Sequence, residues 1–131
     1  MIHHIALTIN DFDDLINFYE KVLAFNLHHR FGLDAALSKT IFDIEEKTEV
    51  VVMRLRDMEL ELFISNCKAQ NAYSHVCLKY YNSELIYKKA QEASYRTFVK
   101  PRDGHDAYFI WDKSGNLFEI KELNEDEARL K

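Results

Sequence analysis

The chain contains little cysteine, proline or glycine. Its 131 residues include two cysteines, one proline and three glycines. Two cysteines without a closely spaced partner give no disulfide framework, and a chain of this length buries a core without one. So few prolines and glycines leave no linker or low-complexity stretch. We therefore expect one domain over residues 1–123, followed by a charged tail over residues 124–131.

Long apolar runs and blocks of like charge are also missing. The apolar runs fall far short of the ~20 residues that cross a bilayer. The 17 basic and 22 acidic residues are scattered and give a net charge of −5, which argues against a nucleic-acid surface or a basic membrane patch. No basic segment followed by an apolar run opens the chain. We expect a cytoplasmic protein that binds a small molecule, with no nucleic-acid or membrane partner.

Two short motifs each occur twice. His4-Ile5-Ala6-Leu7 recurs as His75-Val76-Cys77-Leu78, and Glu61-Leu62-Phe63 is echoed by Glu119-Ile120-Lys121. The histidines are 71 residues apart and the glutamates 58, so the second half is shorter between its helix and its last strand. The chain is therefore interpreted as a duplication, with one module over residues 1–66 and another over residues 73–123.

Hydrophobic periodicity predicts the same order of elements, βαβββ, in both modules, which places the fold in the α+β class. Each module opens with an alternating strand and continues with an amphipathic helix, capped by Asp11 in the first module and by Asn82 or Ser83 in the second. The later strands are predicted over residues 26–31, 39–44, 49–56 and 58–65 in the first module and 97–100, 108–111 and 117–123 in the second.

The repeated histidines and glutamates share one side of these strands. Alternation turns His4, Glu61, His75 and Glu119 away from the apolar face. A single strand histidine or glutamate is more often a solvent-exposed or hydrogen-bonded residue, but four at matched positions favour a ligand set. Two imidazoles and two carboxylates suit Ni, Zn, Co, Mn or Fe(II). In an octahedral arrangement, two coordination positions stay open for water or a chelating substrate.

These motifs resemble the vicinal oxygen chelate superfamily, which includes glyoxalase I, bleomycin resistance proteins and extradiol dioxygenases. The resemblance also rests on the segment Phe18-Tyr19-Glu20-Lys21-Val22-Leu23 and on Asp112-x-x-Gly115-Asn116-x-x-Glu119. It implies paired βαβββ modules that form an open eight-stranded metal-binding cup, assembled as a homodimer. His4, Glu61, His75 and Glu119 match the four metal-ligand positions.

Two histidines with two glutamates look most like glyoxalase I. That resemblance implies a divalent transition metal that holds two substrate oxygens, while Glu61 or Glu119 moves a proton between adjacent carbons. Glutathione-dependent glyoxalases of this pattern carry arginine and asparagine where this chain has Thr8 and Ser65. A hydroxyl does not replace a bidentate guanidinium. The expected function is therefore a lyase or isomerase reaction that does not use glutathione.

Two alternatives stay open. In an Fe(II) dioxygenase, His4, His75 and Glu119 would form the metal triad and Glu61 would be incidental. In a metal-free protein of the bleomycin-resistance type, the cup would sequester a drug or metabolite. The sequence also leaves open whether the two modules complete the site within one chain or across the dimer.

Four further residues are candidates for substrate binding. Thr8 and Lys79 share the parity of the histidine strands, and Arg54 lies on a strand that can point inward. His105 belongs to a glycine-containing loop, where superfamily members often close over the ligand. His3 has the opposite parity to His4, so it is expected on the other face.

Overall fold

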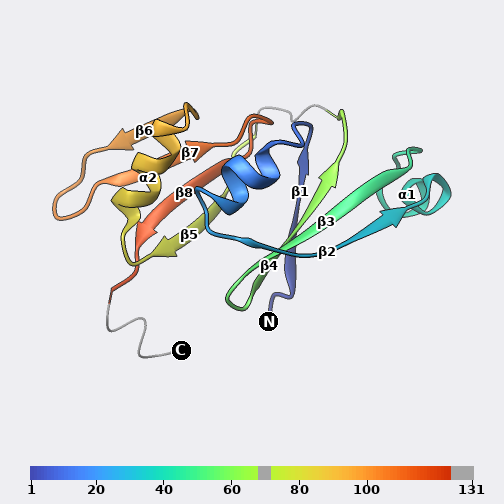
Figure 1. Ribbon diagram of the computed structural model, residues 1–131, viewed down its shortest axis with the longest axis horizontal. Coiled ribbons are helices and arrows are strands. Elements are labelled where there is room, and N and C mark those ends of the chain that lie inside the picture. Colours follow the sequence, from blue (N-terminus) through green and yellow to red (C-terminus); the bar gives the residue numbers. More distant parts are fainter. Residues whose placement is uncertain (68–71, 125–131) are drawn as a thin grey trace.

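Two four-stranded sheets make up the described part of the chain. The computed structural model describes residues 1–67 and 72–124, so most of the predicted tail lies outside the described residues. The strand orders are β1-β4-β3-β2 and β5-β8-β7-β6 (Figure 1). The first sheet comprises β1 (His4–Ile9), β2 (Asn26–Leu33), β3 (Thr48–Leu55) and β4 (Met58–Ile64), and the second β5 (Val76–Tyr80), β6 (Thr97–Lys100), β7 (Ala107–Trp111) and β8 (Leu117–Glu122).

Strand register repeats between the sheets and confirms the paired βαβββ modules. β1 runs parallel to β4, with Ala6 opposite Glu61. β5 runs parallel to β8, with Cys77 opposite Glu119. The remaining neighbours in each sheet are antiparallel. We call β1 to β4 the first module and β5 to β8 the second.

The first helix is shorter and wider than the sequence suggests. Residues Leu15–Glu20 form a π-helix, η1, with Asp14 and not Asp11 at its start. The Asp11 carboxylate instead accepts a hydrogen bond from the Asp13 amide at 3.0 Å, in the turn before the helix. Phe18 and Tyr19 are both fully buried. The wide turn thus brings two adjacent aromatic side chains into the core.

One predicted strand is wrong. Residues 39–44, expected to be extended, belong largely to helix α1 (Ala35–Phe42). Asp34 caps this helix by accepting a hydrogen bond from the Leu37 amide at 2.8 Å, and Asp43 ends it in the left-handed conformation. The second module has helix α2 (Ser83–Glu92), capped by Asn82 as expected. Residues 101–106 join β6 to β7 directly, so the shortening falls between helix and last strand, as predicted.

One hydrophobic core spans both modules. The Phe18 ring of η1 lies 4.8 Å from the Tyr95 ring and 5.6 Å from the Phe118 ring, so a helix of the first module packs on elements of the second. Figure 1 shows η1 across the middle of the molecule, between α2 and β2. Leu60 and Leu62 of β4 and Ile120 of β8 are fully buried in the same core.

A buried polar network joins the modules. The Tyr95 hydroxyl donates to Asp14 at 2.6 Å, and the Tyr19 hydroxyl donates to Asp112 at 2.6 Å. The Lys113 amide also donates to Asp14, at 2.8 Å. We call Asp14, Tyr19, Tyr95 and Asp112 the inter-module clasp. Burial raises the pKa of both carboxyl groups, while their hydrogen bonds oppose that rise.

Removing one donor of the clasp tests its contribution. Tyr95→Phe leaves the buried Asp14 carboxylate with one donor fewer, and we expect the free energy of unfolding to fall by about 1.5–3 kcal/mol at pH 7. Urea denaturation measures it, with the fully exposed Tyr73 changed to Phe as the control.

The same variant predicts a pH dependence. The Tyr95 hydrogen bond lowers the pKa of Asp14, so it stabilises the ionised carboxylate. The difference between Tyr95→Phe and the unaltered protein should narrow as the pH falls through the folded-state pKa, because Asp14 is then protonated in both. An equal difference at all pH values would contradict an ionised Asp14 in the clasp.

Candidate metal centre

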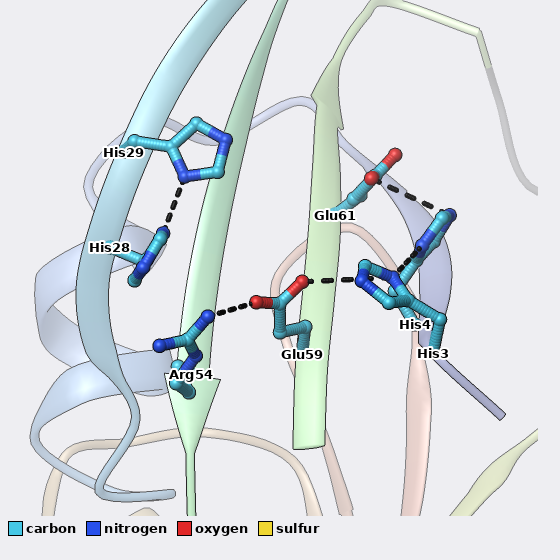
Figure 2. A network of polar contacts seen from close by, with 7 residues as sticks. All are labelled: His3, His4, His28, His29, Arg54, Glu59 and Glu61. Carbon is cyan, nitrogen blue, oxygen red and sulfur yellow. Dashed lines mark hydrogen bonds and ion pairs between the residues drawn. The ribbon is translucent and has the colours of Figure 1, made fainter. Parts of the chain in front are cut away.

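The first half-site consists of His4 on β1 and Glu61 on β4. The His4 Nε2 atom lies 3.4 Å from the Glu61 Oε2 atom, and their side chains are 39% and 18% exposed. Figure 2 shows both side chains on the same side of the sheet. Leu60 and Leu62, the neighbours of Glu61, are buried on the opposite side. The first half-site therefore lies on the face turned away from the core.

The second half-site repeats this arrangement with His75 and Glu119. The His75 Nε2 atom lies 3.8 Å from the Glu119 Oε2 atom. The His75 Nδ1 atom lies 2.8 Å from the Tyr73 carbonyl oxygen. A carbonyl only accepts hydrogen bonds, so Nδ1 carries the proton and the Nε2 lone pair of a neutral His75 faces Glu119. This is the tautomer that a metal ligand needs.

A thiol adjoins the second half-site. Cys77 lies opposite Glu119 in the register of β5 and β8. Burial and the neighbouring, hydrogen-bonded Glu119 carboxylate raise the pKa of the Cys77 thiol. The equivalent position of the first module is Ala6, opposite Glu61. The two half-sites thus share their histidine and glutamate but differ in this neighbour.

The spacing of the first pair fits a shared divalent ion, and that of the second pair comes close to it. With metal–nitrogen and metal–oxygen bonds of about 2.0–2.2 Å, neighbouring ligand atoms lie about 2.9–3.5 Å apart. The pair in the first half-site has this spacing, and the pair in the second exceeds it by a few tenths of an ångström. One imidazole and one carboxylate in each half-site are also the ligand types that Mn, Fe, Co, Ni and Zn accept.

One chain does not bring the four predicted ligands together. Among residues 1–67 and 72–124, no three histidine, cysteine, aspartate or glutamate side chains are close enough to hold an ion. His4 and Glu61 belong to one sheet. Glu119 lies on β8 of the other sheet, and His75 directly precedes β5. The chain therefore presents two half-sites with two donors each.

An ion-pair network extends from the first half-site. Figure 2 shows the Arg54 guanidinium on β3 directed at Glu59 on β4. The His3 Nδ1 atom lies 3.8 Å from Glu59 and 2.9 Å from the Nδ1 atom of His4. The hydrogen bond from Arg54 lowers the pKa of Glu59. Arg54, predicted to bind substrate, here neutralises a carboxylate beside the half-site.

The predicted position of His3 is wrong. His3 precedes β1, which begins at His4, so strand alternation does not fix its direction. Its ring packs edge-on against His4 at 5.2 Å. Figure 2 also shows His28 and His29, which lie on β2 of the same sheet. Histidines therefore gather on the outer face of the first sheet.

The other substrate candidates lie in different places. Thr8 lines a cavity of about 130 Å³ beside the first half-site. Lys79 is exposed on β5, opposite Lys121 of β8 and in the strand of Cys77. His105 is exposed in residues 101–106. The structure thus places Thr8 and Arg54 on the first module and Lys79 and His105 on the second.

Sequence reasoning missed the wall of this cavity. Ser38 and Phe42 of α1, with Ile44 and Glu46 after it, line the cavity together with Phe63. The sequence pattern does not predict these lining residues because it indicates a strand over residues 39–44. Asp34 followed by two alanines and a leucine was the available signal of a capped helix.

Comparison with known proteins identifies the family. The sequence model of the Glyoxalase/Bleomycin resistance protein/Dioxygenase superfamily matches residues 1–120. A search of curated proteins found no match. No helix of residues 1–67 and 72–124 combines the length and apolar character needed to cross a membrane.

Solved structures share the fold at low sequence identity. A glyoxalase family protein from Enterococcus faecalis is 22% identical with a TM-score of 0.68, over 92% of this chain and 95% of that one. A mutant of the fosfomycin resistance protein FosX from Listeria monocytogenes, complexed with Mn(II) and 1S,2S-dihydroxypropylphosphonic acid, is 16% identical with a TM-score of 0.74, over 100% and 98%. FosX from Mesorhizobium loti is 13% identical with a TM-score of 0.69, over 100% and 98%.

The ion pair beside the first half-site gives a direct prediction. Arg54→Met removes the hydrogen bond that lowers the pKa of Glu59, so this pKa should rise toward the ordinary glutamate value. Carboxyl-detected NMR titration measures it. Arg56→Met removes the same charge from the following turn and should leave the pKa of Glu59 much closer to its original value. Equal shifts in both variants would show a general charge effect.

Proposed function

Because the chain belongs to the Glyoxalase/Bleomycin resistance protein/Dioxygenase superfamily, we propose that it is a metal-dependent lyase or isomerase of glyoxalase type. Its substrate is a small molecule with vicinal oxygens, and glutathione is not required. The observation that carries this proposal is the matched pair of half-sites, His4 with Glu61 and His75 with Glu119, at corresponding places in the two modules.

The ligand set and the comparisons support this function. Two histidines and two glutamates leave room for two substrate oxygens on an octahedral ion. The Listeria FosX mutant was crystallised with both Mn(II) and a dihydroxy compound, so this fold accommodates a divalent ion and a ligand with vicinal oxygens.

The surroundings of the first half-site support independence from glutathione. Thr8 lines an apolar cavity, and the Ser65 hydroxyl donates a hydrogen bond to Glu46 at 3.3 Å. Neither residue offers a positive charge to a thiol cofactor's carboxylates. The guanidinium of Arg54 is already paired with Glu59.

We further propose that the active form is a homodimer with shared sites. Each chain presents two donors at each half-site, and both half-sites lie on exposed faces away from the core. A second copy that places its second module over the first module of its partner supplies the missing donors. Twofold symmetry then generates two equivalent sites from one interface.

The glutamates would carry the proton chemistry. A divalent ion, when bound, acts as a Lewis acid that stabilises negative charge on the substrate oxygens. Glu61 and Glu119 are the two carboxylates able to accept a proton from one substrate carbon and return it to the next. Glu119 accepts a hydrogen bond from the Cys77 thiol, whereas Glu61 faces Ala6, so the two carboxylates have different neighbours.

Metal titration tests the site directly. His4→Ala should weaken binding of Mn, Co, Ni or Zn by more than roughly 100-fold, since losing an outer partner of a ligand already costs about 10- to 100-fold. His28→Ala, a histidine of the same face on β2, is the control and should bind as the original protein does. Elemental analysis of protein purified without added metal gives the resident ion.

The outcomes also separate the alternatives. Protein that contains no metal as purified and binds none of Mn, Fe, Co, Ni and Zn would contradict the proposal and leave the metal-free sequestering role. Oxygen consumption during turnover would instead favour the Fe(II) dioxygenase. Once a substrate is known, Glu61→Gln and Glu119→Gln should divide the roles, with about 100-fold or more loss of turnover in the variant that lacks the base. Full turnover in both variants would contradict proton transfer by these glutamates.

Mixed dimers test the sharing of sites. His4→Ala and His75→Ala chains carrying different tags are co-expressed and purified through both tags. If sites form across the interface, one site of each mixed dimer keeps all four ligands, so one tightly bound ion per dimer is expected. If each site lies within a chain, none is expected.

The reverse combination is the control for this experiment. A dimer of one unaltered chain and one chain with both His4→Ala and His75→Ala has no complete site across the interface, but one complete site within a chain. Shared sites predict no tightly bound ion here. One ion in this dimer and none in the other would overturn the shared site, as would a strictly monomeric protein.

A further inference from the structure

The cavity beside the first half-site breaks the symmetry of the two modules. It lies between the outer face of the first sheet and helix α1, and Figure 1 shows α1 at the far end of β2 and β3. The second module joins β6 to β7 without a helix. Both modules therefore have a histidine–glutamate pair, but in the described residues only the first has the helix that covers this cavity.

The walls of the cavity are mainly apolar. Ala6 of β1, Phe63 of β4, Phe42 of α1 and Ile44 contribute apolar surface, and the Phe42 and Phe63 rings meet edge-on at 5.3 Å. Its volume is about 130 Å³. A cavity of about 150 Å³ lined by leucine, isoleucine and phenylalanine binds benzene. This cavity therefore has room for an apolar group of about six carbons.

Strand register places the cavity next to the predicted metal ligands. Ala6 lies directly opposite Glu61, and Thr8 lies opposite Phe63, two residues further along both strands. Two residues of a strand span about 6.6 Å. A substrate whose oxygens reach the His4 and Glu61 donors can thus place a substituent in the cavity without crossing another strand.

One carboxylate sets the charge of the cavity. Among the described lining residues, Glu46 carries the only formal charge, and its carboxylate accepts a hydrogen bond from the Ser65 hydroxyl. The other polar groups are hydroxyls, such as those of Thr8 and Ser38, and the Cys67 thiol. An anionic substituent would be repelled here, whereas an uncharged one, or one that ends in a hydrogen-bond donor, is compatible.

We propose that this cavity is the specificity pocket of the enzyme, and that it holds an uncharged, largely apolar substituent of phenyl or branched-alkyl size. The inference rests on the proposed function for the position of the chelating oxygens. It assigns the substrate class: a small compound with two vicinal oxygens at one end and a compact apolar group at the other.

Hydroxamates test this inference, because they chelate divalent metals through two oxygens. The metal-loaded, full-length protein should bind phenylacetohydroxamate about 30-fold more tightly than acetohydroxamate, as expected for burying an aromatic ring. Ser38→Leu fills the cavity from the buried side of α1 and should abolish this preference. Thr40→Leu makes a comparable change on the exposed side of the same helix and should keep it.

Acetohydroxamate is the internal control for folding. Its affinity should be the same in all three proteins, because it reaches only the metal. If phenylacetohydroxamate binds no more tightly than acetohydroxamate, or if Ser38→Leu keeps the preference, the specificity pocket is overturned.

A second probe separates the pocket from the metal function. Benzyl alcohol added to metal-free protein should give saturation-transfer NMR signals with the original chain and with Thr40→Leu, but not with Ser38→Leu. If hydroxamates fail to bind while this pattern holds, the metal function falls and the apolar pocket stands. If benzyl alcohol does not distinguish Ser38→Leu from Thr40→Leu, the pocket falls whatever the metal result.

Discussion

The rest of the structure depends on two buried carboxylates, Asp14 and Asp112, that accept hydrogen bonds across the boundary between the modules. Asp14 belongs to the first module, but its donors, the Tyr95 hydroxyl and the Lys113 amide, belong to the second. Asp112 belongs to the second module and accepts the Tyr19 hydroxyl of the first. Pulling the modules apart would break these three hydrogen bonds, and a hydrogen bond to a charged group contributes about 1.5–3 kcal/mol. The clasp therefore fixes η1 against the second sheet. Because the apolar faces of both sheets are used in this contact, the half-sites are left on the outer faces.

The clasp also reaches the candidate metal centre. Asp112 accepts the backbone amides of Ser114 and Asn116, which shape the turn that leads into β8. The Asn116 side chain donates to the Thr8 carbonyl oxygen of β1 at 2.9 Å. Gly115 takes the positive φ of 93° that this turn requires. The start of β8, and with it Glu119, is thereby tied to the end of β1, the strand of His4. The Asp112-x-x-Gly115-Asn116 pattern is thus a structural connection between the modules, while Glu119, which follows it, is the residue proposed to bind the metal.

Local periodicity predicts the strands that the structure describes, apart from the false strand over residues 39–44. It also predicts on which side of a strand a site residue lies. His4, Glu61 and Glu119 lie on the side predicted for them because a strand directs alternate side chains to opposite faces. His75 directly precedes β5 and lies beside Glu119. Helix α1 was missed because Thr40, Ile41 and Phe42 have the composition of a strand, and the cap at Asp34 outweighs that propensity. The separation of the four ligands into two pairs could not be predicted either. It depends on the packing of Phe18 against Tyr95 and Phe118, which are far away in the sequence. Long-range contacts of this kind leave no trace in a local pattern.

A duplicated ligand set allows a substrate to bind in two orientations, and helix α1 bears on which of them is used. Two equivalent half-sites around one ion would hold a substrate with vicinal oxygens in either of two orientations, and each glutamate would face the wrong carbon in one of them. Proton transfer between adjacent carbons needs one defined orientation, because the base must lie within hydrogen-bonding reach of the carbon that loses the proton. In the described residues, a helix follows the second strand of the first module only, and the cavity lies beneath this helix. A substituent buried there distinguishes the two ends of the substrate. In the proposed site, the additional helix of the first module would thus add an asymmetry to the difference between Ala6 and Cys77 beside the two glutamates.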